Sequence, residues 1–115
     1  MITWEDFTKI DIRAETIVKA ELFEGAKKPA FRLWVDLGVG LGIKKSSAQI
    51  TNLYHPDELI GRQVVCVVNF RAKQIGTFLS EVLVTGFPHE HGGVVLTSVD
   101  KSVPNGARLY QLVHL

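Results

Sequence analysis

Two short stretches combine cations with hydroxyl and amide side chains. The first is KKSSAQI, over residues 44–50, and the second is RAKQIGTFLS, over residues 71–80. Lys and Arg attract phosphate oxygens by charge, and Ser and Gln side chains hydrogen-bond to them. A single basic stretch is equally typical of a solvated strand end, so each stretch alone leaves both interpretations open. The recurrence of the same combination favours a shared binding site for a polyanion.

Two other motifs that resemble ligand sites favour structural roles. Gly38, Gly40 and Gly42 resemble a dinucleotide fingerprint, but the third glycine comes one residue early and a strand is expected to follow. We therefore expect a hairpin turn there. His89 and His91 form an H-x-H pair for which no third metal ligand is evident, so we expect neither a metal nor another cofactor.

The candidate nucleophiles do not predict an enzyme. Ser46, Ser47 and Ser80 lack a G-x-S-x-G elbow, and no His and acid partners can be assigned to them. Cys66 lies within the apolar run VVCVV, which is typical of an inert buried thiol on a central strand. We expect a binding protein without catalytic residues.

The net charge of +1 excludes a strongly basic nucleic-acid coat protein, but the charges are unevenly distributed. Residues 27–73 contain eight Lys or Arg and three Asp or Glu, an excess of +5. The remaining residues contain five cations and nine carboxylates, which gives −4. The near-neutral total therefore conceals a basic middle segment.

Length and composition indicate one ordinary globular domain. The chain has 115 residues, of which 46% are hydrophobic and 22% charged, so we expect residues 1–115 to form a single domain. No apolar run reaches the roughly 18 to 20 residues of a spanning helix, and the first residues are acidic, unlike a signal peptide. We expect a soluble cytoplasmic protein without membrane insertion.

Alternation of apolar and polar residues predicts a mostly β structure. In a long first strand, the even-numbered residues from Ile10 to Ala20 are expected to face the core, and Ile17 is expected to be an exposed apolar residue. Further strands are expected over residues 31–38, 41–46, 62–70, 81–87 and 92–99, each bounded by turn residues.

Two short helices are expected. Thr3 can cap a turn over residues 4–7, with Asp6 completing a capping box. The second helix is expected within residues 51–61, where Pro56 suits a first turn and Gly61 suits the end.

This element order predicts an all-β OB-fold, a Greek-key barrel of five strands with a short helix between strands three and four, here with N- and C-terminal extensions. An SH3-like barrel and a sandwich are the alternatives that the pattern leaves open. OB barrels bind ligands on strands two and three and on the loops after strands one and four. The basic residues on these elements are Lys27, Lys28, Arg32, Lys44, Lys45, Arg71 and Lys73.

Most of the chain resembles the CsaA family, stand-alone members of the tRNA-binding domain group that is also appended to aminoacyl-tRNA synthetases. The matching stretches are, in order, DIRAETIVKAE, VDLG, SSAQIT, YHPDELIGRQVVCVVNF, SEVLVTG and VPNGARL. The resemblance implies an OB-fold, a homodimer, tRNA binding, and chaperone-like binding of preprotein segments in protein export.

The resemblance and the charge pattern together give the expected RNA-binding residues. The resemblance implies Ser46, Ser47, Gln49, Asn69, Lys73, Ser80 and Glu81. The charge pattern adds Lys44, Lys45 and Arg71, and Phe78 is added as an aromatic at a loop tip on which a base could stack. Members of the family often carry prolines after the Asn-Phe pair, where this chain has Arg71 and Ala72, so we expect a more flexible loop.

Two functional hypotheses follow, a tRNA-binding protein and a homodimeric export-related chaperone that binds unfolded preproteins or peptides. The candidate residues for a peptide-binding surface or a dimer interface are Trp4, Phe7, Ile17, Trp34 and Tyr110. Salt separates the hypotheses, because phosphate-driven binding weakens steeply as salt rises and apolar peptide binding does not.

Overall fold

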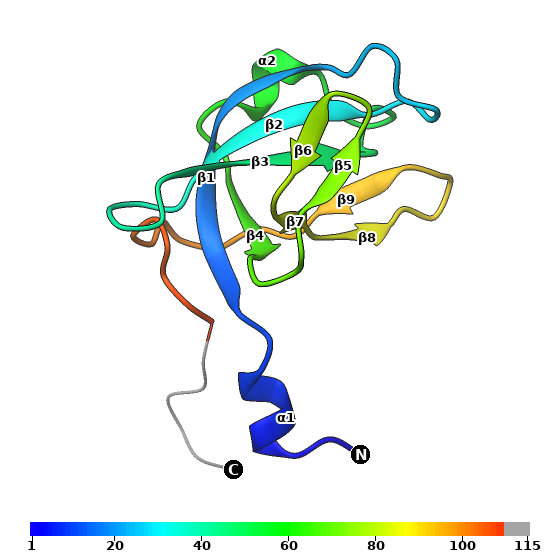
Figure 1. Ribbon diagram of the computed structural model, residues 1–115. Helices are drawn as coiled ribbons and strands as arrows, with labels where there is room; N and C mark the ends of the chain where they lie inside the picture. The colour runs from blue at the N-terminus through cyan, green and yellow to red at the C-terminus, as the bar shows by residue number, and fades with distance from the viewer. Residues whose placement is uncertain (110–115) are drawn as a thin grey trace.

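The computed structural model describes residues 1–109 and has the predicted barrel (Figure 1). Strands β1 (Ile12–Leu22), β2 (Phe31–Asp36) and β3 (Ile43–Ala48) form an antiparallel meander, and β4 (Gln63–Val67) returns to lie beside β1. Strand β7 (Leu83–Val84) pairs with β4, which gives the order β3-β2-β1-β4-β7. The Lys45 carbonyl accepts the N–H groups of Glu81 and Val82, at 2.7 and 3.2 Å, so the two edges of the sheet meet. The predicted Greek-key OB-fold is confirmed.

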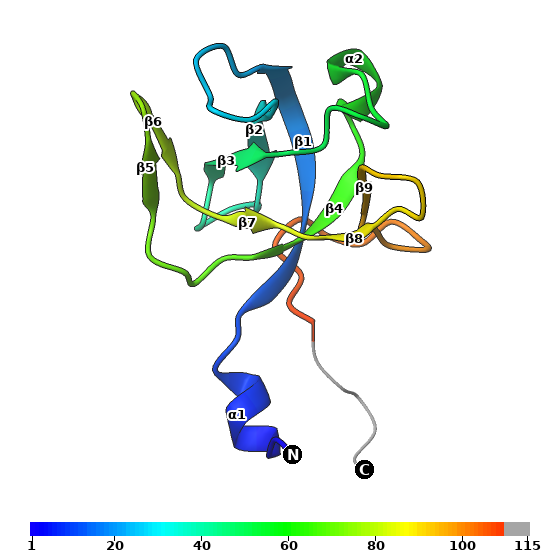
Figure 2. The same cartoon turned by 90° about the vertical axis from the view of Figure 1, so that its right-hand side faces the viewer.

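Both predicted helices are present. Helix α2 (Pro56–Leu59) lies between β3 and β4, and its Leu59 is fully buried in the barrel core. Helix α1 (Trp4–Thr8) begins with the predicted capping box, in which the N–H of Asp6 donates to the Thr3 hydroxyl at 3.1 Å. Helix α1 buries none of its residues and extends away from the barrel in both views (Figure 2). Within residues 1–109 no helix has the length and apolar content needed to span a membrane.

Two hairpins extend the barrel. The predicted fifth strand is divided into β7 and β8 (Gly86–Pro88), and β8 pairs with β9 (Val94–Leu96). The loop after β4 contains a hairpin, formed by β5 (Lys73–Ile75) and β6 (Phe78–Ser80), and Arg71 and Ala72 lie just before it. Gly76 supplies the left-handed turn between these strands, with φ of +59°.

The prediction for Ile17 is wrong, because this side chain is fully buried in the barrel core. The register between β1 and β2 shifts between Ile17 and Lys19, which places an extra residue in β1. The bulge exchanges the inward and outward faces of the strand, from the odd-numbered Glu15 and Ile17 before it to the even-numbered Ala20 after it. Cys66 is fully buried, as predicted.

Two polar side chains are buried in the barrel wall without hydrogen-bond partners among residues 1–109. Glu15, opposite Val64 in the pairing of β1 with β4, has both carboxyl oxygens unpartnered. Desolvation by burial raises the pKa of Glu15 to about 8, so the carboxyl is mostly protonated at neutral pH. The Ser46 hydroxyl is likewise buried and unpartnered.

The segment of residues 104–109 completes the outer edge of β1. Pairing of β1 with β2 begins only at Thr16, so the first part of β1 has a free edge on that side. The segment fills this edge through backbone hydrogen bonds between Ala14 and Ala107, at 2.9 Å, and between Leu109 and Ile12, at 2.8 Å. The Arg13 guanidinium also donates to the carbonyl of Gly106, 93 residues later in the chain.

Candidate nucleic-acid interface

A groove of about 430 Å³ lies where β3, the β5–β6 hairpin and the start of β7 meet. Its polar lining consists of Ser47, Gln49, Arg71, Lys73, Ser80 and Glu81, and its apolar lining of Phe70, Ile75, Val82 and Leu83. Ser47 N–H donates to the hydroxyl of Ser80 at 3.0 Å, which joins β3 to β6 along the groove. The two stretches separated by more than 20 residues in the sequence are thus brought to one concave surface.

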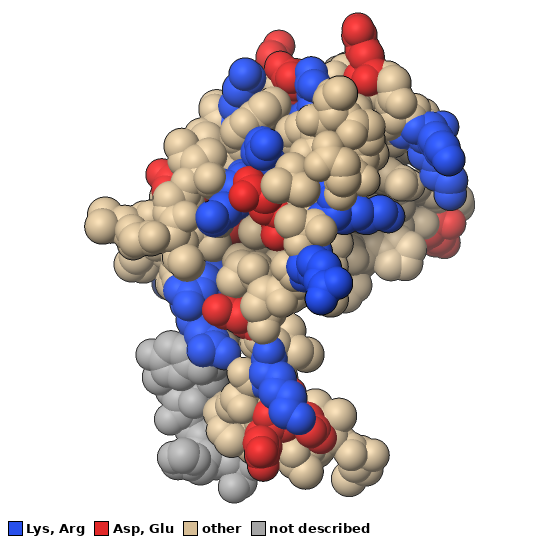
Figure 3. Space-filling model, in the orientation of Figure 1, with Lys and Arg blue, Asp and Glu red and all other residues tan. Residues whose placement is uncertain are grey.

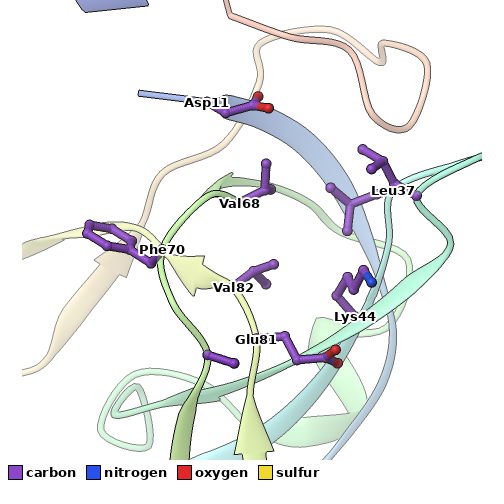
Figure 4. A pocket seen from close by; sticks show the side chains of 9 residues that line it. Asp11, Leu37, Lys44, Val68, Phe70, Glu81 and Val82 are labelled. Carbon is purple, nitrogen blue, oxygen red and sulfur yellow. The ribbon is translucent and has the colours of Figure 1, made fainter. Parts of the chain in front are cut away.

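A second cavity, of about 310 Å³, opens at the mouth of the barrel (Figure 4). Its lining includes Asp11, Leu37, Lys44 and Ala72, together with three residues that also line the groove: Phe70, Glu81 and Val82. Because the two cavities share these residues, they adjoin along the chain between β4 and β7. We refer to them below as the groove and the mouth cavity.

Most of the residues expected to bind RNA line one of these cavities. The six polar residues of the groove all belong to that expected set, and Lys44 lines the mouth cavity. They come from β3, from the hairpin and from its flanks, which are the elements that an OB barrel uses for ligands. Arg71 and Lys73 are exposed, so their charges are available to a ligand.

Four of the expected residues lie elsewhere, and three of these are polar. Ser46 points into the barrel because side chains alternate along β3, and its hydroxyl cannot reach a ligand. Asn69 uses its side chain structurally, since it accepts from the N–H of Asp11 at 3.0 Å and donates to the Lys9 carbonyl at 2.7 Å. The ammonium of Lys45 lies 5.4 Å from the centre of the Phe78 ring, on the outer face of the sheet.

The expectation that Phe78 lies at an exposed loop tip is wrong. Phe78 is buried and packs edge-on against Phe23, with ring centres 5.4 Å apart, and against Trp34, at 5.8 Å. Together with Ala30 these side chains bind the β5–β6 hairpin to the β1–β2 loop and to β2. Trp34 is half-buried in this cluster and carries the Lys19 ammonium 4.5 Å from its ring centre, so it is not the exposed apolar group we expected.

Phe70 is an exposed aromatic residue that sequence reasoning missed. It is 59% exposed and lies at the boundary between the groove and the mouth cavity, across the latter from Leu37 and Lys44 (Figure 4). The sequence predicted a strand over residues 62–70, with Phe70 as its last residue, whereas β4 ends at Val67. The preceding Asn69, a residue typical of turns, was the available indication that the strand ends earlier.

Positive charges on the barrel occur as separate points. On the face shown in Figure 3, Lys and Arg side chains are separated by uncharged surface and by single carboxylates. Some of these cations are neutralised, since the Arg32 guanidinium is paired with Glu21, whereas Lys27 and Lys28 are exposed in the β1–β2 loop. The basic middle segment therefore offers individual cations around the groove rather than one continuous stripe.

The N-terminal aromatic residues form a different surface. Trp4 is 53% exposed and stacks at a tilt on Phe7, with ring centres 5.5 Å apart. These rings line a cavity of about 310 Å³ with Ile10, Arg108 and Leu109. Tyr110, which we expected to share this surface, lies outside the described residues.

The His89 and His91 pair lies in the turn between β8 and β9. The N–H of His91 donates to Nδ1 of His89 at 3.2 Å, so that nitrogen already accepts a hydrogen bond. Within residues 1–109 no group of three or more His, Cys, Asp or Glu residues is placed to hold a metal ion.

Comparison with known proteins gives consistent matches over nearly the whole chain. Residues 12–108 match the family described as "Putative tRNA binding domain". The crystal structure of the chaperone CsaA from Bacillus anthracis is 48% identical, with a TM-score of 0.88, over 96% of this chain and 99% of that one. The CsaA chaperone protein of Picrophilus torridus is 47% identical at the same TM-score, over 96% and 100% of the two chains.

A match to aminoacyl-tRNA synthetases is more distant and partial. Methionine–tRNA ligase 1 of Bacillus anthracis is 30% identical over 108 residues, which are 94% of this chain. The chain spans only 16% of that ligase. The likeness is therefore to one segment of the ligase.

Proposed function

The chain belongs to the tRNA-binding domain family and within it to the CsaA group, and from this we propose that it binds tRNA through the groove and the mouth cavity. Residues 1–115 act as a single binding domain in this proposal. The protein works in the cytoplasm, where tRNA is found, and makes or breaks no covalent bond.

The observation that carries the proposal is the convergence of Lys44, Arg71 and Lys73 on two adjoining cavities that are also lined by hydroxyl and amide groups. Exposed cations that contact phosphates release counterions from the nucleic acid, which supplies most of the sequence-independent affinity. Ser47, Ser80 and Gln49 add hydrogen bonds to phosphate or ribose oxygens. We infer a site that follows the RNA backbone and recognises mainly its shape.

The test is binding of total tRNA between about 50 and 200 mM salt, where phosphate-driven affinity changes strongly. Replacing Lys73→Glu should weaken binding and reduce the slope of log affinity against log salt by about 0.7 to 0.9 for each phosphate that the protein no longer neutralises. Lys101→Glu makes the same charge change at an exposed residue outside both cavities and is the matched control. Equal effects of the two variants would remove the groove from the proposal.

A chaperone function is the second candidate, and exposed apolar side chains, one of them in the groove, favour it. Leu83 lines the groove and is exposed, and Phe87 and Val95 form an exposed cross-strand pair on β8 and β9. Apolar patches of this kind bind partner chains, such as an unfolded preprotein on its way to export. Capture of an unfolded polypeptide that persists at high salt, and that tRNA does not displace, would favour this function.

We also propose that the protein is a homodimer whose interface includes helix α1. Trp4, Ile10 and Leu109 are exposed around one apolar cavity, and none of the residues of α1 is buried by the barrel. A helix that carries two aromatic rings and covers no core of its own is stabilised by packing on a second copy.

A further inference from the structure

We propose that the boundary between the groove and the mouth cavity holds one unpaired nucleotide, with its base stacked on Phe70 and an amino group of that base donating to Glu81. This inference rests on the proposed RNA binding and specifies which part of an RNA enters the site.

Phe70 is presented to solvent by a fixed backbone. The side chain of the preceding Asn69 is bound at both ends, to the N–H of Asp11 and to the carbonyl of Lys9, which ties the end of β4 to the start of β1. The ring that follows is 59% exposed and borders both cavities. An aromatic ring held in this way stacks on a nucleic-acid base without having to be ordered first.

Among residues 1–109, Glu81 is the one carboxylate that lines both cavities. Its Oε1 accepts the N–H of Lys45 at 3.1 Å, and its Oε2 has no hydrogen-bond partner within residues 1–109. An ionised carboxylate only accepts hydrogen bonds, and it repels phosphate. Among the groups of an RNA, the donors on a base edge therefore fit Glu81 best.

The cations lie on both sides of these two residues. Lys44 lines the mouth cavity, whereas Arg71 and Lys73 line the groove. The phosphates before and after the stacked nucleotide would each find a cation if the backbone passed from one cavity into the other. A base can enter such a site only when it is unpaired, because a paired base presents neither a free ring face nor a free edge.

The geometry also predicts which base is accepted. Cytosine, adenine and guanine carry exocyclic amino donors, whereas uracil has carbonyl acceptors at the corresponding positions. Cytosine and uracil have rings of the same size. Uracil carries an N3–H donor on this edge, but the O2 and O4 carbonyls flank that donor on both sides and repel a carboxylate, whereas the N4 amino group of cytosine has an acceptor on one side only, so the pair tests the role of Glu81. We expect the site to discriminate against uracil.

The experiment compares the binding of single-stranded oligo-C and oligo-U RNA of eight nucleotides by fluorescence anisotropy at one salt concentration. The unmodified protein should bind oligo-C about tenfold more tightly, as expected for one hydrogen bond to a charged group. Glu81→Gln keeps an acceptor for the Lys45 N–H but offers the base a donor as well. It should abolish the preference, whereas a purely structural or repulsive role of Glu81 would change both affinities by the same factor.

A second variant tests the stack. Phe70→Ala should weaken binding of either oligonucleotide about tenfold or more, in the range measured for one base on an aromatic ring, and should leave binding of a blunt RNA duplex unchanged. Ile60→Ala removes an apolar side chain of similar exposure, 49%, outside both cavities and should change neither. Phe70 and Ile60 are both exposed, so the folded state should survive each substitution.

The outcomes separate this inference from the proposed function. If the unmodified protein binds tRNA in a salt-dependent way but Phe70→Ala and Glu81→Gln leave oligonucleotide binding unchanged, the nucleotide site is wrong and tRNA binding stands. If the unmodified protein binds no RNA, both are wrong.

Discussion

Glu15 couples the stability of the barrel to pH. Its carboxyl is buried opposite Val64 on β4, without a hydrogen-bond partner among residues 1–109. Desolvation raises its pKa to about 8 from an ordinary value of 4.5. Between these two values the folded protein holds a proton that the unfolded chain releases, so the free energy of unfolding falls as pH rises.

We expect the stabilising contribution of the protonated Glu15 carboxyl to be complete below about pH 4.5 and lost above about pH 8. Each pH unit in this window corresponds to about 1.4 kcal/mol. Replacing Glu15→Met removes the titrating group at similar volume. The free energy of unfolding that Glu15→Met gains should therefore be larger at pH 9 than at pH 5, by a few kcal/mol. Urea unfolding of both proteins at these two pH values measures the difference.

Glu24→Met is the matched control, since Glu24 is exposed in the β1–β2 loop. It should leave the pH dependence of unfolding as it is in the unmodified protein. The same pH dependence in Glu15→Met and the unmodified protein would mean that the Glu15 carboxyl is hydrated or paired in solution.

Packing of Phe78 fixes the β5–β6 hairpin to the rest of the barrel. The hairpin supplies Lys73, Ile75 and Ser80 to the groove, and Phe78 is its buried contact with Phe23. The shape of the groove therefore depends on a side chain that does not line it.

Replacing Phe78→Ala should lower the free energy of unfolding by about 2 to 4 kcal/mol, near the lower end for large-to-small changes in a core, because this cluster is small. It should also weaken tRNA binding although every cation is kept, since the hairpin is no longer held against β2. Urea unfolding and tRNA titration measure the two effects. Phe78→Leu should restore most of the free energy of unfolding and most of the tRNA affinity. If Phe78→Ala destabilises the protein but leaves the tRNA affinity normal, the position of the hairpin does not matter for binding.

At the level of elements, the barrel could be predicted from the sequence, whereas two local features could not. The order of strands and helices follows from local periodicity and turn residues, and both can be read directly from the sequence. The bulge before Lys19 is invisible to such a pattern, because the inserted residue changes which positions face inward, from Ile17 before it to Ala20 after it. The β5–β6 hairpin is too short and polar to show alternation.

The candidate site could be predicted only as a set of segments. Ser47, Gln49, Arg71 and Lys73 were expected and do meet in the groove. The exchange of roles between Phe78 and Phe70 depends on tertiary packing, since the buried ring has partners on β2 and in the β1–β2 loop. The residues adjacent to either phenylalanine in the sequence do not indicate these partners.

At the scale of the whole molecule, helix α1 is the part that the barrel leaves uncovered. We expect light scattering at micromolar concentration to give twice the chain mass of 12.8 kDa. Replacing both Trp4→Ala and Phe7→Ala should give a monomer whose barrel unfolds normally, because neither ring packs into the barrel core. Phe87→Ala should remain dimeric. A monomeric unmodified protein, or a dimeric double variant, would contradict an interface at α1.

The segment of residues 104–109 has a consequence for folding on the ribosome. β1, the central strand of the sheet, is made early, but the segment that fills its remaining edge is made about 90 residues later. At translation rates of about 5 to 20 residues per second, this part of β1 stays unpaired on one edge for roughly 5 to 20 s. During this interval the nascent chain presents an open strand that can pair with other chains. Each newly made molecule is thus transiently exposed to mispairing, until its last described residues close the sheet.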